Sequence, residues 1–149
     1  MKKLILLLCG IILLSGCGKK EETVVATCKR DEIQPTYTAS FTFVLKTIDN
    51  ESVSSLDISS LYNLTYTDVD PASINNKIKE EVEIYKKDFK DVSAEIGNNE
   101  QQPFYSLSIP MNEENVKFFQ NADPTYVKDG KLLISNYRNF LSASGYVCS

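Results

Sequence analysis

The chain has 149 residues with 16 Lys and Arg against 20 Asp and Glu, a formal net charge of -4, and neither His nor Trp. Its length predicts one domain, and 42% hydrophobic with 24% charged residues is ordinary for a folded protein. The acidic balance disfavours nucleic acid as a partner, and the missing His excludes Ser-His-Asp and Cys-His catalysis.

The N-terminus has the pattern of an export signal. Lys2 and Lys3 precede an apolar run that covers residues 4–14. At about 1.5 Å of rise per residue, this run is too short for a helix to cross a bilayer core about 30 Å thick. The pattern therefore predicts a signal peptide over residues 1–16, which export would remove.

The residues after this run resemble the lipobox of bacterial lipoproteins. They read Leu14, Ser15, Gly16 and Cys17. In that class a diacylglycerol is attached to the Cys thiol and the signal is cut just before it. The resemblance implies that Cys17 is the lipid attachment site and that the chain is anchored at the extracytoplasmic face of the cell membrane. The alternatives are an ordinary secretory signal that happens to carry a Cys and an uncleaved anchor.

The remaining cysteines predict a disulfide. Cys9 lies in the predicted signal peptide and Cys17 is assigned to lipid, which leaves Cys28 and Cys148 near the two ends of the exported part. Two remaining thiols in an exported protein favour a bridge between them. In the chain-entropy model such a long loop contributes about 4–5 kcal/mol. Two free thiols or a redox pair are the alternatives, and no C-x-x-C spacing supports the latter.

The exported part begins with a charged stretch and continues into strand patterns. Residues 17–27 predict a short lipidated tether, so residues 28–149 form the single domain. Residues 28–33 predict a strand. Residues 37–48 alternate between apolar and polar side chains, which indicates a half-buried antiparallel strand. Its inward positions are Tyr37, Ala39, Phe41, Phe43 and Leu45.

The next run predicts the partner of this strand. Residues 52–67 follow a turn at Asp49–Glu51, so the two runs are expected to form a hairpin. Leu61 is out of step with the alternation, which predicts a bulge near Ser59 and Ser60.

Helix signals follow in the second half. Asp70 and Pro71 suit the cap and first turn of a helix, and an apolar stripe from Ile74 to Phe89 predicts it over residues 71–90. A second hairpin is expected from residues 92–96 and 104–109. Two shorter helices are expected over residues 113–120 and 136–144, the last one capped by Ser135 and ended by Gly145.

The resulting order, β-β-α-β-β-α-α, predicts an α+β fold. An antiparallel sheet of about four strands with helices packed on one face satisfies it. The layout, with the lipobox, Cys28 and a closing Gly145 to Cys148, resembles a family of small bacterial lipoproteins of low-GC Gram-positive type, and more distantly the YehR-type lipoproteins. This resemblance implies a membrane-anchored α+β domain and no known activity.

The search for catalytic and metal-binding motifs finds little. No G-x-S-x-G, S-x-x-K or Gly-rich phosphate loop is present. Asp68 and Asp70 match the start of a calcium loop that lacks its Gly. Glu80, Glu81 and Glu83 are interpreted as a solvated helix face. The eight Tyr suit either a sugar-stacking surface or half-buried strands, and we favour the strands.

These observations predict a protein that acts by binding. We expect a non-enzymatic, lipid-anchored extracytoplasmic interaction domain without cofactor or metal, whose partner is an envelope protein or a cell-wall component and not nucleic acid. A small-molecule carrier or sensor is the alternative, because the side of a curved sheet beneath a helix is a natural pocket. A hydrolase built from carboxylates ranks third.

Overall fold

The structure is a computed structural model of the 149-residue chain, and it describes residues 20–64, 70–97 and 102–149. The predicted signal peptide, the residues Leu14 to Gly16 and the predicted lipid attachment site Cys17 lie outside the described residues. None of the described helices is long and apolar enough to cross a membrane.

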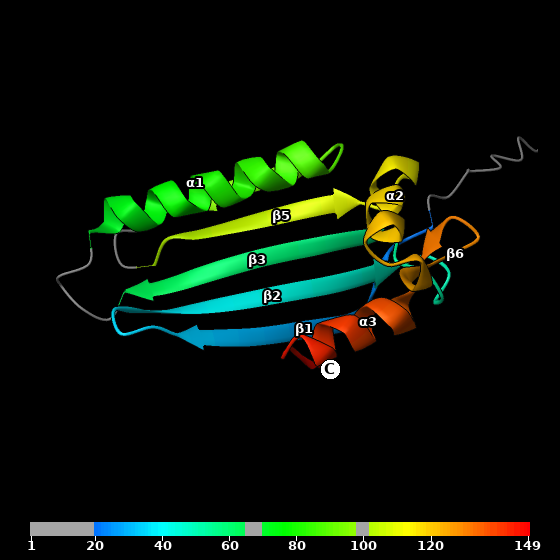
Figure 1. Cartoon of the computed structure of the whole chain (residues 1–149), viewed down its shortest axis with the longest axis horizontal. Coiled ribbons are helices and arrows are strands. Elements are labelled where there is room, and N and C mark those ends of the chain that lie inside the picture. The colour runs from blue at the N-terminus through cyan, green and yellow to red at the C-terminus, as the bar shows by residue number, and fades with distance from the viewer. Residues whose placement is uncertain (1–19, 65–69, 98–101) are drawn as a thin grey trace, which may run out of the picture.

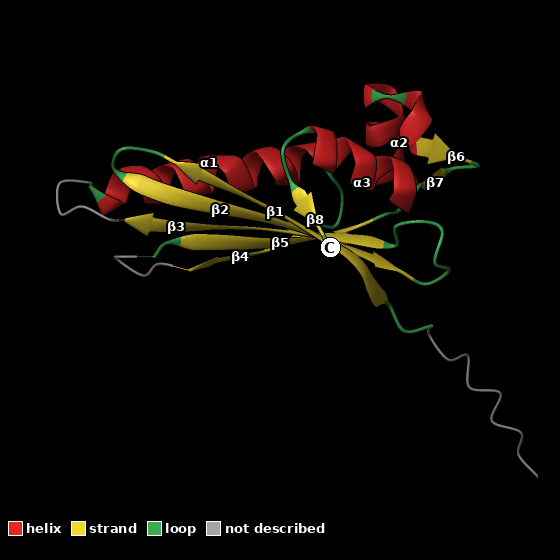
Figure 2. Ribbon diagram, turned by 90° about the horizontal axis from the view of Figure 1, so that it is seen from below, coloured by secondary structure: helices red, strands yellow, loops and turns green. Residues whose placement is uncertain are grey.

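The described residues form one large antiparallel sheet with three helices on a single face (Figures 1 and 2). The strand order is β4-β5-β3-β2-β1-β8. The strands are β1 (Thr23–Ile33), β2 (Tyr37–Thr47), β3 (Ser55–Leu64), β4 (Ser93–Gly97), β5 (Phe104–Pro110) and β8 (Val147–Cys148). The helices are α1 (Pro71–Asp88), α2 (Glu113–Ala122) and α3 (Ile134–Ala143). A 3-10 turn, η1 (Pro124–Tyr126), leads into the small hairpin β6 (Val127–Lys128) and β7 (Lys131–Leu132).

The predicted α+β class is confirmed, but the sheet is larger than expected. It has six strands among the described residues instead of about four. Part of the difference is β8, which pairs with β1 through Cys28–Cys148 and Lys29–Val147 only. A two-residue strand is too short to show an alternating pattern, so sequence periodicity cannot reveal it.

The sheet begins earlier than predicted. Residues 23–27, assigned above to the tether, lie in β1, where Thr23 pairs with Thr47 and Ala26 is buried. Glu22 is also fixed, because its carboxylate accepts hydrogen bonds from the hydroxyls of Ser54 and Ser55 at 2.7 and 3.0 Å. The described fold therefore reaches back to Glu22, and the segment between it and Cys17 is shorter than expected.

The bulge predicted in the second hairpin strand is wrong. β2 and β3 pair without a register shift, and the shift lies instead in β1, between Val24 and Ala26. Leu61 keeps the regular alternation and simply faces the side of the sheet away from the helices, where it is 37% exposed.

The helix ends agree with the sequence at two of three caps. The Asp70 carboxylate accepts the Ala72 N–H at 3.0 Å at the start of α1, and Gly145 ends the last helix region with φ +87°. The predicted Ser135 cap is wrong, because α3 begins at Ile134 and its capping residue, Leu133, offers no side-chain acceptor. Instead, the start of α3 is held by backbone: the Ile134 N–H donates to the Glu51 carbonyl at 3.2 Å.

Candidate ligand groove

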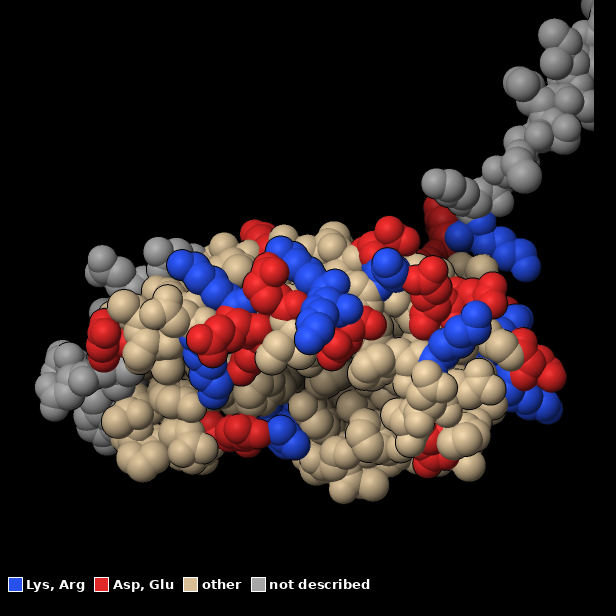
Figure 3. All heavy atoms as spheres, turned by 45° about the horizontal axis from the view of Figure 1, so that its top comes forward, with Lys and Arg blue, Asp and Glu red and all other residues tan. Residues whose placement is uncertain are grey.

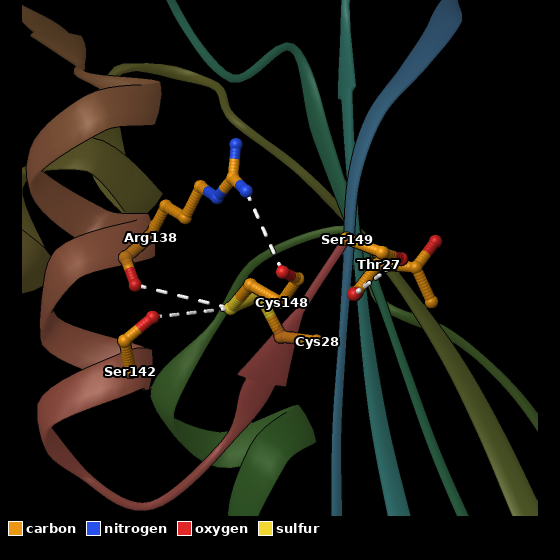
Figure 4. Close-up of a disulfide and its surroundings, with 6 residues drawn as sticks. All are labelled: Thr27, Cys28, Arg138, Ser142, Cys148 and Ser149. Carbon is orange, nitrogen blue, oxygen red and sulfur yellow. Dashed lines mark hydrogen bonds between the residues drawn. A yellow bond between two sulfur atoms is a disulfide. The ribbon is translucent and has the colours of Figure 1, made fainter.

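Cys28 and Cys148, the two cysteines predicted to pair, meet across the edge of the sheet (Figure 4). The sulfur atoms of Cys28 and Cys148 lie 2.04 Å apart, at bonding distance, as predicted. Beside them, reciprocal backbone hydrogen bonds of 3.0 Å join Thr27 to Ser149. The bridge thus fixes β8 to the middle of β1, and with it the segment from Gly145 that turns back from α3.

A groove opens on the helix-bearing face between α1 and this C-terminal segment. α1 packs over β4 and β5, α3 packs against β1, and the middle strands stay partly uncovered between them. Figure 3 shows charged side chains gathered along α1 and a hollow of uncharged atoms beside them. The groove has a volume of about 350 Å³. It is lined by Arg30, Phe41, Phe43, Ile58, Glu81, Ile84, Tyr85, Tyr105 and Tyr146.

One wall of the groove is built around Arg30. The guanidinium lies 4.7 Å from the centre of the Tyr146 ring and 5.8 Å from that of Phe41, within cation–π range. Its Nη1 donates to the Ser144 carbonyl at 3.0 Å, and Nη2 pairs with Glu32. Arg30 therefore connects β1 to the C-terminal segment. Phe43 completes this wall, with its ring perpendicular to that of Tyr146 at 5.1 Å.

The opposite wall carries a carboxylate held by tyrosine hydroxyls. Glu81 on α1 accepts the hydroxyl of Tyr62, which lies 3.3 Å from both carboxylate oxygens. Lys77, one turn earlier on the helix, is 4.0 Å from Glu81 and lies over the rings of Tyr37 and Tyr62 at 5.7 and 5.6 Å. The groove thus has a carboxylate on the helix side and a guanidinium on the strand side.

The tyrosines around Glu81 stay protonated at neutral pH. Burial raises the pKa of Tyr62 to about 12. Burial likewise raises the pKa of Tyr85 and of Tyr105, and the nearby Glu81 charge raises both further. Phenols with raised pKa values act as neutral hydrogen-bond donors and acceptors, not as bases. The groove therefore offers apolar rings, fixed hydroxyls and two opposite charges, a combination suited to binding an amphipathic group.

The structure separates the three helix carboxylates that the sequence grouped together. Glu80 and Glu83 are exposed, as a solvated face predicts, whereas Glu81 faces the groove. Asp70 serves as the cap of α1, and its calcium-loop neighbour Asp68 lies outside the described residues. In the three described segments, no group of three or more Cys, Asp or Glu side chains lies close enough to hold a metal ion.

Sequence reasoning missed the groove because its residues come from five separate elements and the turn before β8. One signal was present: Arg30 falls between Cys28 and Glu32 on the inward parity of β1, where a charge is unexpected. The interpretation of the tyrosines as half-buried strand residues is wrong for Tyr62, Tyr105 and Tyr137, which are fully buried in the core, and Tyr137 lies on α3. Tyr85 and Tyr146, which are only partly buried, provide the open ring surface.

Comparisons with known proteins support the fold alone. No family model matches the chain, and no curated protein does either. Among solved structures, the NMR structure of the E. coli YehR protein is similar with a TM-score of 0.53 and 13% identity, over 87% of this chain and 92% of that one. An NMR structure of a Streptococcus pneumoniae TIGR4 protein aligns with a TM-score of 0.47 and 14% identity, over 100% and 98% of the two chains. The chain thus has a YehR-like fold.

Proposed function

We propose that this chain is a lipid-anchored, extracytoplasmic binding domain. The anchor is supported by the signal pattern and by the lipobox-like Leu14 to Cys17. The extracytoplasmic location is supported by the Cys28–Cys148 bridge, because disulfides persist in oxidising compartments. The YehR-like fold agrees with the resemblance to small bacterial lipoproteins.

The observation that carries the binding role is the open groove beside α1. Ile84 on its rim is 57% exposed, and Phe41, Phe43 and Tyr146 are only partly buried. Apolar and aromatic surface that stays open in a rigid setting is typical of interaction sites. Its fixed rings need little ordering on binding, which favours affinity. The proposed partner is an envelope protein or a cell-wall component that inserts an apolar group here.

A small-molecule carrier or sensor is the second candidate, and the size of the groove favours it. Its volume of about 350 Å³ falls at the lower end of the range of about 300–1,000 Å³ for small-molecule sites. A ligand bound there would raise the melting temperature with its concentration. Screening amphipathic compounds by thermal shift tests this candidate, and a flat response to all of them would contradict it.

Photo-crosslinking in living cells tests the proposed binding role. A photoreactive residue in place of Ile84 places the probe on the groove rim. The matched control carries the same residue in place of Lys79, which is exposed on the other side of the same helix. We expect one dominant adduct from position 84 and none from position 79. Identical adduct patterns at the two positions would contradict a partner in the groove.

We propose a non-enzymatic role for this domain. The groove holds one carboxylate and no nucleophile paired with a base among its lining residues. Reproducible turnover of any substrate by the purified protein, lost on Glu81→Gln, would contradict this proposal.

A further inference from the structure

The face of the sheet that carries no described helix has an unusual surface. Figure 2 shows the helices on one side of the strands and the other side open. The centre of this face is formed by small hydroxyl residues. Those hydroxyl residues are Ser40, Thr42, Ser59, Ser106 and Ser108, contributed by three neighbouring strands.

The pairing register arranges these side chains in rows across the strands. The middle row joins Thr42, Ser59 and Ser106 and ends in Lys29 on one side and Glu95 on the other. Neighbouring strands are about 4.8 Å apart, so hydroxyls repeat along the row at about that spacing. Two hollows lie over these hydroxyl residues, of about 530 and 390 Å³.

An aromatic ring lies over Gly97, beside the middle row. Phe104 pairs with Gly97 across β5 and β4, and a Cβ built on Gly97 would sit 1.9 Å from the Phe104 ring. The ring therefore covers the space that a side chain at position 97 would occupy. Phe104 stays partly exposed, and Leu61, next to it on β3, extends the apolar strip. The result is an apolar strip along one side of the hydroxyl residues.

The charges that line the two hollows nearly balance, with Lys29 and Lys46 against Asp31, Asp57 and Glu95. Lys46 pairs with Asp57, which also accepts the Ser108 hydroxyl at 2.7 Å. Lys29 and Asp31 lie two positions apart on β1 and line the same hollow. A face with both signs of charge side by side has no preference for a polyanion or a polycation, so it fits a neutral partner.

We propose that this open face binds a neutral glycan chain. Serine and threonine hydroxyls both donate and accept hydrogen bonds, as sugar hydroxyls do. Because these hydroxyls stand in rows across the strands, successive sugars of an extended glycan chain can each bind one of them. The flat Phe104 ring stacks against the apolar face of one pyranose. A second copy of this chain fits poorly, because sheets that pack face to face need apolar inner faces.

This inference goes beyond the proposed groove by assigning a second site with its own class of partner. It rests on the proposed function only for the location of the domain outside the cytoplasm. The glycan face and the groove lie on opposite sides of the sheet, so the two sites can be tested separately.

The test is an NMR titration of the detergent-solubilised full chain with cellohexaose, chitohexaose and maltohexaose as probes. We expect at least one of them to shift the amide signals of the open face. Ser59→Lys places a long charged chain among the hydroxyl residues and abolishes these shifts, whereas Thr38→Lys, on the same face but outside both hollows, leaves them intact. Phe104→Ala weakens binding about tenfold through loss of stacking.

The outcomes separate this inference from the groove. Ile84→Lys, on the groove side, leaves glycan binding unchanged. Three findings would each overturn the glycan assignment: no shift with all three probes, equal effects of Ser59→Lys and Thr38→Lys, or self-association through this face seen by sedimentation. If any of these findings occurred together with a dominant photo-crosslinking adduct at position 84, the glycan assignment would fail while the groove proposal would still be supported.

Discussion

Asn115 on α2 shows how one buried polar side chain connects three elements. Its Oδ1 accepts the Lys90 N–H at 2.7 Å, and its Nδ2 donates to the carbonyls of Lys90 and Pro110 at 2.9 and 2.7 Å. The side chain therefore pairs the backbone that follows α1 with the end of β5. It is buried, so no solvent can replace these bonds.

Replacing this residue tests that role. Asn115→Ala leaves buried backbone groups without partners, so we expect the free energy of unfolding to fall by about 2–4 kcal/mol. Gln120→Ala, an exposed change on the same helix, serves as the control and is expected to have almost no effect. Chemical denaturation of both variants measures the difference, and equal stabilities would refute the assigned role.

The tyrosines predict a weakness at alkaline pH. Burial raises the pKa of Tyr62 to about 12 from an ordinary value of 10.0, and burial also raises the pKa of Tyr105 and Tyr137. Below pH 10 these phenols are protonated whether the chain is folded or not. Between about pH 10 and 12 only the unfolded chain ionises, so the free energy of unfolding falls as the pH rises.

Two measurements check the alkaline prediction. We expect the melting temperature to decrease steeply above about pH 10, and ultraviolet titration to show tyrosines that ionise only on unfolding. Ionisation of all the tyrosines together near pH 10.0 in the folded protein would contradict the raised pKa values.

Among the secondary-structure elements, β8 depends most on one covalent bond. It has two residues, and its pairing with β1 is reinforced by the Cys28–Cys148 bridge. Tyr146, immediately before it, forms a wall of the groove against Arg30. The disulfide therefore supports both the stability of the domain and the shape of its candidate site.

Removing the bridge tests this link. Because the closed loop is long, Cys28→Ala with Cys148→Ala is expected to lower the free energy of unfolding by about 2–5 kcal/mol. Under conditions where the chain still folds, the adduct at position 84 is expected to weaken as the Tyr146 wall loosens. Ser142→Ala is the control, because the Ser142 hydroxyl lies 3.5 Å from the Cys148 sulfur and its removal leaves the disulfide in place. An unchanged melting temperature in the double variant would contradict the stabilising role of the disulfide.

Elements with a clear period or cap could be predicted from the sequence. The stripe of Ile74, Ile78 and Val82 correctly predicts α1, and the alternation from Tyr37 correctly predicts β2. Features that depend on contacts between residues distant in the sequence could not be predicted in this way. The start of α3 is one case, because its first N–H is held by the carbonyl of Glu51 and not by a side chain nearby in sequence.

The candidate site was less predictable than the fold. The disulfide followed from counting cysteines, since only Cys28 and Cys148 remained to pair. Finding the groove required knowing that α1 and α3 cover opposite edges of the same face of the sheet and leave β2 partly open between them. That packing depends on the whole molecule. The one indication of it in the sequence was the charged Arg30 at an inward-facing position of β1.

The proposed lipid anchor would hold the domain close to a membrane. Ser54 and Ser55 fix Glu22, so the proposed lipid on Cys17 lies at most roughly 18 Å of extended chain away. With that anchor, the end of the sheet near Glu22 would face the bilayer. Multiple acyl chains would make the attachment stable, where one alone would be marginal.

The proposed extracytoplasmic lipid anchor is tested by the intact mass of the protein, extracted from the membrane fraction and alkylated at its free thiols without reductant. We expect a chain that begins at Cys17 and carries a diacylglyceryl group, with Cys28 and Cys148 unalkylated. The Cys17→Ala variant is expected to yield an uncleaved or soluble product. A chain that retains Met1 and has alkylated thiols at positions 17, 28 and 148 would contradict the anchor, the export and the bridge together.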